Sequence, residues 1–287
     1  MNEPRMEPAS EGGGEGDRAS GSKTGAAGRE RTTPMEFGAP RPPTQGELVL
    51  YRVCRAIAVG ASCLFFPGRV TGAENLPVSG AFILAPVHRS NLDWLLVARV
   101  TRRRLRYIAK AEVWKSKRIG RFIEALGAFP VNRSGADREA LERCRAVLAG
   151  GEPLVMFPEG TRRSGREVED LREGVAYLAL RAGVPVVPVG IGGSEKAMPR
   201  GAKVPRPRRI DIVIGTAVYP PEPDTRAHPA PGASENGNAA PPSAPARTRV
   251  SRRAMREFSD RLGEAIQSAF DESERQLATT TMSGRRR

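Results

Sequence analysis

The chain has 287 residues, with 46 Lys and Arg against 32 Asp and Glu, and a formal net charge of +14 at pH 7. Its three cysteines, Cys54, Cys63 and Cys144, have no metal-ligand spacing, and their odd number argues against a disulfide framework, which favours a reducing, cytosolic setting. The acidic, glycine-rich N-terminus lacks the basic region and apolar core of a signal peptide.

The composition divides the chain into four segments. Residues 1–45 hold almost no large apolar side chains, so they cannot bury enough surface to offset their chain entropy, and we predict a disordered tail. Residues 46–220 have the length of a single domain with one core. Residues 221–249 are a Pro/Ala-rich linker by composition, and residues 250–287 predict an amphipathic helix and a basic tail that docks on the domain or on a membrane.

The first helical pattern is apolar. Its most apolar stretch, 56–68, has 13 residues, which are too few to span a bilayer. Upstream, Tyr51 and Val53 lie among Arg52 and Arg55, a pattern typical of an amphipathic helix in a membrane interface or of one that packs on a core. The sequence leaves these two alternatives open and favours peripheral attachment over a spanning helix.

Strands and helices alternate through the middle of the chain. Short apolar runs typical of buried parallel strands lie at 81–87, 105–111, 153–158, 184–191 and 210–218. Helical patterns lie at 91–102, 116–127, 137–151 and 174–183, and another follows the linker at 252–270. The alternation predicts an α/β fold, a single domain whose mostly parallel sheet is covered by helices.

His88 is the first candidate for acid–base chemistry. It is one of two histidines, it follows the predicted strand 81–87, and Asp93 comes five positions later. Sites in α/β sheets lie at the carboxyl ends of strands. An aspartate that accepts a hydrogen bond from Nδ1 fixes the tautomer and leaves Nε2 to take a proton from a substrate. The spacing favours a general base with an orienting partner, and a structural histidine is the alternative.

Two further stretches contain candidate anion ligands. In 127–133 an apolar turn is followed by Arg133, whose guanidinium matches the geometry of phosphate oxygens. In 159–162, Gly160 permits close backbone approach, and Thr161 and Arg162 are suited to bind an anion. Glu159 follows a buried strand, where a carboxylate is costly without a partner or a task. A surface salt bridge and a capped turn are the alternatives.

Two basic runs indicate an anionic partner. Residues 101–123 carry nine Lys and Arg against one Glu, and residues 192–209 carry six against one. Phosphate head groups, an acidic membrane surface and nucleic acid all fit such charge. With only four Tyr and two Trp, the chain shows no basic motif interleaved with aromatic residues, so we expect no nucleic-acid partner.

Taken in order, the motifs H-x4-D, G-x-F-x-x-x-R, F-P-E-G-T-R and V-P-V-V-P-V resemble the glycerolipid acyltransferase family over roughly residues 80–195. They look most like its 1-acylglycerol-3-phosphate acyltransferases. The resemblance implies transfer of a fatty acyl group from acyl-CoA or acyl carrier protein to the hydroxyl of lysophosphatidic acid, giving phosphatidic acid. It implies these co-substrates but no metal or other cofactor, and peripheral attachment to the cytoplasmic face of the cell membrane.

The resemblance also implies roles for residues. His88 corresponds to the general base and Asp93 to its orienting partner, and the apolar run 184–191 belongs to the acyl-donor side. The residues that match the family's acceptor-binding positions are Lys110, Arg133, Glu159, Gly160, Thr161 and Arg162.

The sequence departs from the common family pattern at two places. Its first block reads Val87-His88-Arg89-Ser90, and His-Arg-Ser also looks like the glycerol-3-phosphate acyltransferase branch. Asn132 stands where an aspartate is more usual, which removes an anionic charge beside Arg133. The alternative acceptors are therefore glycerol-3-phosphate, another lysophospholipid or a glycolipid. A non-catalytic module that binds anionic lipid or nucleic acid is the alternative of a different class.

Overall fold

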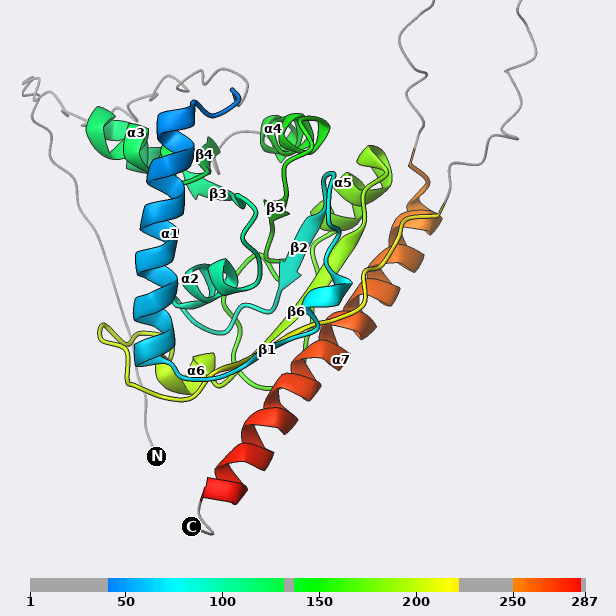
Figure 1. The fold of residues 1–287 in the computed structure, drawn as a ribbon. Coiled ribbons are helices and arrows are strands. Elements are labelled where there is room, and N and C mark those ends of the chain that lie inside the picture. The colour runs from blue at the N-terminus through cyan, green and yellow to red at the C-terminus, as the bar shows by residue number, and fades with distance from the viewer. Residues whose placement is uncertain (1–40, 132–136, 222–249, 285–287) are drawn as a thin grey trace, which may run out of the picture. The chain divides into compact units, whose positions relative to one another are not determined.

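A computed structural model describes residues 41–131, 137–221 and 250–284. Within them a seven-stranded sheet has the order β1-β7-β6-β2-β5-β3-β4 (Figure 1). The strands are β1 Val70–Thr71, β2 Ile83–Pro86, β3 Arg106–Lys110, β4 Ala128–Val131, β5 Leu154–Val155, β6 Val186–Gly192 and β7 Asp211–Ile214. Neighbouring strands are parallel except β6 and β7, which are antiparallel, so the predicted mostly parallel sheet is confirmed.

Helices cover both faces of this sheet (Figure 1). On one face α5 contacts both α4 and α7, and on the other α1 contacts α2 and α3. The α-helices are α1 Gln45–Phe65, α2 Asp93–Leu96, α3 Lys117–Ala125, α4 Asp137–Ala149, α5 Gly174–Ala182, α6 Ser194–Ala197 and α7 Arg252–Gly284. The described residues also form three short 3-10 helices, η1 Ala73–Asn75, η2 Val97–Arg99 and η3 Ala111–Lys115.

Some elements differ from those that the sequence predicts. The stretch expected as an apolar turn, 127–133, contains strand β4, so that expectation is wrong. β4 is an edge strand that pairs only with β3 among the described strands, and an edge position tolerates Pro130, which has no N–H to donate. The helix expected at 91–102 is instead the single turn α2 followed by η2.

Helix α7 is part of the core. It has 33 residues, more than the 252–270 pattern indicates, and it packs against β6 and β7 rather than standing apart. Its buried side chains Phe258, Leu262, Ile266 and Phe270 recur every four residues. A Cβ at Gly190 of β6 would lie only 2.1 Å from the carbonyl oxygen of Ala269, so the helix backbone lies directly on the strand.

Helix α1 is anchored by a few hydrogen bonds, including one from Arg55 to the carbonyl of Ala98 at 2.8 Å, and many of its apolar side chains are exposed. Thr44 caps its N-terminus in a capping box with Glu47, and the buried Tyr51 hydroxyl accepts the N–H of Leu105 at 3.2 Å. The helix has 21 residues, so the 13-residue apolar stretch understates its length. By length and composition alone it is long and apolar enough to cross a membrane, and only 11% of its most apolar window is buried in the fold.

The predicted domain boundaries fall largely at the edges of what the structure describes. Residues 1–40, most of the predicted linker 221–249 and residues 285–287 lie outside the described residues. The division into a tail, a domain from 46 to 220, a linker and a C-terminal segment therefore stays a prediction.

Candidate active site

The sheet brings two of the predicted motifs together. β2 and β5 are neighbouring parallel strands, so their carboxyl ends meet at one edge of the sheet. His88 follows β2, and Glu159 follows β5. The backbone N–H of His88 donates to Oε2 of Glu159 at 2.8 Å. The edge where sites in parallel sheets are found therefore holds both residues.

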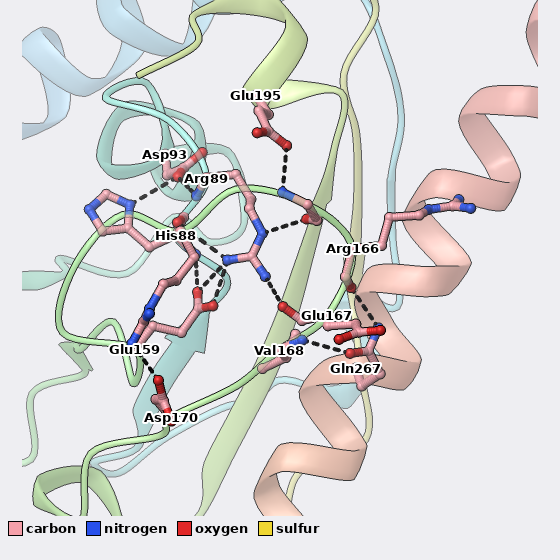
Figure 2. A network of polar contacts seen from close by, with 12 residues as sticks. His88, Arg89, Asp93, Glu159, Arg166, Glu167, Val168, Asp170, Glu195 and Gln267 are labelled. Atoms are coloured by element: carbon pink, nitrogen blue, oxygen red, sulfur yellow. Dashed lines mark hydrogen bonds and ion pairs between the residues drawn. The ribbon is translucent and has the colours of Figure 1, made fainter. Parts of the chain in front are cut away.

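The imidazole of His88 is held on one side by Asp93 and on another by Phe157. Its Nδ1 lies 3.0 Å from Oδ2 of Asp93, whose side chain is fully buried, whereas the His88 side chain is 20% exposed (Figure 2). The ring stacks on Phe157 with centroids 4.2 Å apart. With Nδ1 donating to the carboxylate, the lone pair of the tautomer is on Nε2. This is the contact that the five-residue spacing predicts.

Asp93 receives hydrogen bonds from the backbone as well as from the imidazole. Its Oδ2 accepts the N–H groups of Arg89 and Ser90 at 2.7 and 2.6 Å. The Ser90 hydroxyl accepts the N–H of Leu92 at 3.2 Å and donates to the carbonyl of Met198 at 2.9 Å, so Ser90 closes the turn. These bonds fix the loop that orients His88.

Arg89 is a site residue that the sequence reasoning missed. Its buried guanidinium donates to both carboxylate oxygens of Glu159, at 2.5 and 2.7 Å (Figure 2). It also lies over the ring of Phe270, 5.2 Å from the ring centroid. Glu159 is 2% exposed, so its carboxylate is occupied by the Arg89 guanidinium and the His88 N–H. The available signal was an arginine after one buried strand and a glutamate after another, both of which require partners.

The last three residues of the F-P-E-G-T-R turn, 160–162, face outward. Gly160 has φ +66°, and the side chain of Arg172 lies against it, since a Cβ there would be 2.3 Å from Nε of Arg172. Thr161 is exposed and Arg162 is partly exposed. Within the described part of the chain, the Arg162 guanidinium has no hydrogen-bond or ion-pair partner, so it is available to an anion. No sequence signal placed Arg172 here, because it lies ten residues beyond Arg162.

The structure describes only the backbone of one predicted residue, Lys110, and nothing of another, Arg133. Lys110 ends β3 and pairs with Val131 of β4, which puts its backbone at the same carboxyl edge, but its side chain is outside the described set. Arg133 lies wholly outside the described residues, as does Asn132. The apolar run 184–191 supplies β6, whose residues are all buried in the sheet.

The basic run 101–123 divides into two parts. Arg104 and Arg106 both pair with Glu152 at 3.1 Å, and burial lowers the pKa of Arg106 although Glu152 opposes the shift. Arg103 is used in the fold as well, where it donates to the carbonyls of Pro77, Gly80 and Gly151. The exposed cations lie further along, at Lys115, Lys117, Arg118 and Arg121. Among the described side chains of this run, these four cations and the exposed Arg102 are placed to meet an anionic partner.

The geometry agrees with a comparison against known families. The model of the acyltransferase family matches residues 68–192. Residues 68–192 are thus similar to an acyltransferase domain, and we refer to them by that name. This acyltransferase domain contains His88, Asp93 and the whole 159–162 turn. Helices α1 and α7 lie outside it.

Curated relatives are similar to about half of the chain. The chain is 31% identical over 169 residues to a 1-acyl-sn-glycerol-3-phosphate acyltransferase of Chlamydomonas reinhardtii, which covers 57% of this chain and 50% of that protein. It is 28% identical over 152 residues to the protein of the same name from Bacillus subtilis, covering 53% of this chain and 73% of that protein. The chain thus spans about half the length of the Chlamydomonas relative.

A solved structure has a similar fold. The 1-acyl-sn-glycerophosphate (LPA) acyltransferase PlsC from Thermotoga maritima matches with a TM-score of 0.58 and 23% identity, over 79% of this chain and 80% of that one. Since the alignment covers more of the chain than the acyltransferase domain does, the shared architecture extends beyond residues 68–192.

Proposed function

We propose that this protein is an acyltransferase that moves a fatty acyl group from an acyl thioester to the free hydroxyl of lysophosphatidic acid, giving phosphatidic acid. The observation that supports this most directly is the His88–Asp93 contact of 3.0 Å at the edge of the sheet, inside the acyltransferase domain. The names of the curated relatives favour lysophosphatidic acid as the acceptor.

In the proposed mechanism, Nε2 of His88 takes the proton of the acceptor hydroxyl as its oxygen attacks the thioester carbon. A positioned general base contributes typically ~10²–10⁴-fold. The buried carboxylate of Asp93 stabilises the imidazolium that forms. The tetrahedral intermediate then collapses, the carbon–sulfur bond breaks, and the leaving thiolate takes the proton from the imidazolium. Acyl-CoA and acyl carrier protein are the candidate donors, and no other cofactor is proposed.

The proposed acceptor site lies on the outward side of the 159–162 turn. Arg162 is partly exposed and has no ion-pair partner among the described residues, Thr161 is exposed, and the Arg172 side chain lies against Gly160. Guanidinium groups bind phosphate in a two-pronged geometry, so we assign the acceptor phosphate to this turn, together with Lys110 and Arg133 as the family pattern implies. Holding the phosphate aligns the hydroxyl with the thioester carbon.

Glycerol-3-phosphate is the second candidate acceptor, because the His-Arg-Ser block resembles that branch. Arg89, the residue that distinguishes this block, is buried and paired with Glu159. It therefore supplies no charge to the outward face where the acceptor phosphate is placed. The structure thus gives Arg89 an internal partner, and lysophosphatidic acid stays the preferred acceptor.

The experiment is free-thiol release from palmitoyl-CoA, with lysophosphatidic acid and glycerol-3-phosphate as separate acceptors. We expect release with the lysolipid, and a loss of about 10²–10⁴-fold in His88→Ala. His228→Ala makes the same chemical change at the other histidine of the chain and serves as the matched control. Release with glycerol-3-phosphate alone would move the assignment to that acceptor. No thiol release with either acceptor, with carrier-protein donors as well, would contradict transfer to both of these acceptors and leave another lysophospholipid or a glycolipid as the acceptor.

We also propose that the protein attaches peripherally to the cytoplasmic face of a membrane through α1. Ile57 is 68% and Leu64 83% exposed on this helix. Trp94 of α2 and Phe122 of α3 are also exposed, on helices that contact α1. The exposed cations of α3 are suited to anionic lipid head groups beside this apolar surface.

A further inference from the structure

The backbone of the segment that follows the 159–162 turn is hydrogen-bonded to one side chain of α7, and its Arg166 also pairs with Glu274 of that helix at 4.0 Å. Residues 165–168 belong to no helix or strand. The amide of Gln267 accepts the N–H of Val168 at 2.8 Å and donates to the carbonyl of Arg166 at 3.0 Å (Figure 2). It also donates to Asp271 on its own helix at 3.1 Å. Gln267 thus pairs with the segment as a neighbouring β-strand would.

The opposite side of the same segment is bound by Arg89. Its Nε donates to the carbonyl of Gly165 at 3.0 Å, and its Nη2 donates to the carbonyl of Glu167 at 2.8 Å (Figure 2). The backbone groups of Arg166 and Val168 therefore face Gln267, and the carbonyls of Gly165 and Glu167 face Arg89. Phe270, one turn beyond Gln267, packs on the Arg89 guanidinium at 5.2 Å. One face of α7 therefore contacts the segment through Gln267 and the Arg89 guanidinium through Phe270.

This segment is directly continuous with the candidate acceptor site. The N–H of Arg163 donates to the carbonyl of His88 at 2.9 Å, and Arg162 is the residue before it. Anything that fixes residues 165–168 therefore restricts where Arg162 lies relative to His88. The segment contributes no regular secondary structure of its own, so this restriction comes from the side chains that bind its backbone: Arg89, Gln267 and Glu195, whose carboxylate accepts the N–H of Gly165 at 3.2 Å.

We infer that Gln267 is a positioning residue: it binds the 165–168 segment to α7 and thereby holds Arg162 in the place where it meets the acceptor phosphate. This inference rests on the proposed function and extends it to a helix outside residues 68–192. The helix is a firm support, because the close approach of Ala269 to Gly190 fixes it on the sheet.

The test is Gln267→Met, which keeps the length of the side chain and removes both hydrogen bonds to the segment. Gln276→Met is the matched control, since Gln276 lies on the same helix and bonds to Thr71 and Glu272 instead. We expect the acceptor KM of Gln267→Met to rise about tenfold, with donor KM and melting temperature close to those of the control. A merely structural role would lower the melting temperature and leave the acceptor KM unchanged.

Hydrogen exchange supplies a readout that does not depend on activity. The peptide that covers 163–170 should exchange about tenfold faster in Gln267→Met than in Gln276→Met, because the N–H of Val168 loses its acceptor. Equal exchange, or equal acceptor KM, in the two variants would overturn the inference. If the wild-type protein transfers no acyl groups, the proposed function fails and the acceptor role with it. The exchange rates still decide whether Gln267 holds the segment.

Gln267→Glu is the second variant, should the methionine substitution fail to fold. Its carboxylate still accepts the N–H of Val168 but cannot donate to the carbonyl of Arg166. We expect an acceptor KM between those of wild type and Gln267→Met. A wild-type acceptor KM in a folded Gln267→Glu protein would count against the inference.

Discussion

At the residue scale, the site is built around one buried ion pair. Arg89 and Glu159 have side chains that are each 1% exposed. Removing two charges from water is costly, and the cost is recovered only where every hydrogen-bonding group finds a partner. Arg89 meets this condition by donating to Glu159 and to two loop carbonyls. The pair joins the loop that orients His88 to the loop that carries Arg162.

We predict that breaking this pair destabilises the protein strongly. Arg89→Met leaves the Glu159 carboxylate buried without its cation, which costs about 3–5 kcal/mol. Urea unfolding of the purified variant measures the loss. The double variant Arg89→Met with Glu159→Gln carries no uncompensated charge, so it should regain part of that stability. A single variant as stable as the double variant would show that the pair is not the source of the effect.

The sequence could predict the contact of His88 with Asp93, because five residues separate them and a single loop closes between them. It could not predict Arg89 with Glu159, which are 70 positions apart, or Gln267 with Val168, which are 99 apart. Such contacts depend on strand order and on where α7 docks, and neither is encoded in local periodicity. The acceptor role implied for Glu159 stays a prediction, and its carboxylate faces inward.

At the scale of elements, the close packing of α7 on β6 depends on residues without side chains. A Cβ at Gly190 would overlap the backbone of Ala269, and one at Gly192 would lie 2.7 Å from the carbonyl oxygen of Ser273. Both contacts are with backbone atoms, which cannot move aside as a flexible side chain does. The position of α7 therefore depends on the lack of side chains at Gly190 and Gly192 as well as on the apolar face of the helix.

We predict that Gly190→Ala loosens this packing. The added methyl group forces the helix away from the strand, which costs about 1–3 kcal/mol or more. Gly60→Ala is the matched control, because Gly60 lies within α1 with nothing within 4 Å of an added Cβ. It should be neutral, or stabilising by up to about 1 kcal/mol, since Ala is the better helix former. Thermal unfolding of the two variants distinguishes them, and equal melting temperatures would contradict the packing argument.

Elements with strong local patterns could be predicted, and weak ones could not. Helices α3, α4 and α5 lie within a few residues of the ranges indicated by apolar spacing and terminal glycines. β4 was missed because its four residues include a proline, which usually argues against a strand. β1 was missed because a two-residue strand has no periodicity at all.

At the scale of the whole molecule, α1 carries the exposed apolar face that we propose contacts a membrane. Ile57→Asp should weaken binding to vesicles that contain anionic lipid, because it places a charge in the apolar surface. Val78→Asp is the control, since Val78 is 96% exposed but lies in the loop before β2. Vesicle co-sedimentation measures both variants. If the two bind alike, α1 is not the membrane-contacting surface.

The position of α7 in the chain also governs how the molecule is made. β6 is buried along its whole length, and α7 covers one of its faces. During synthesis β6 leaves the ribosome long before residues 252–284 do, and domains generally fold as units. Until those residues emerge, the strand that carries Gly190 is open to water. A nascent chain that stalls before α7 therefore presents an uncovered sheet, and we expect it to be a substrate for chaperones until synthesis has passed that helix.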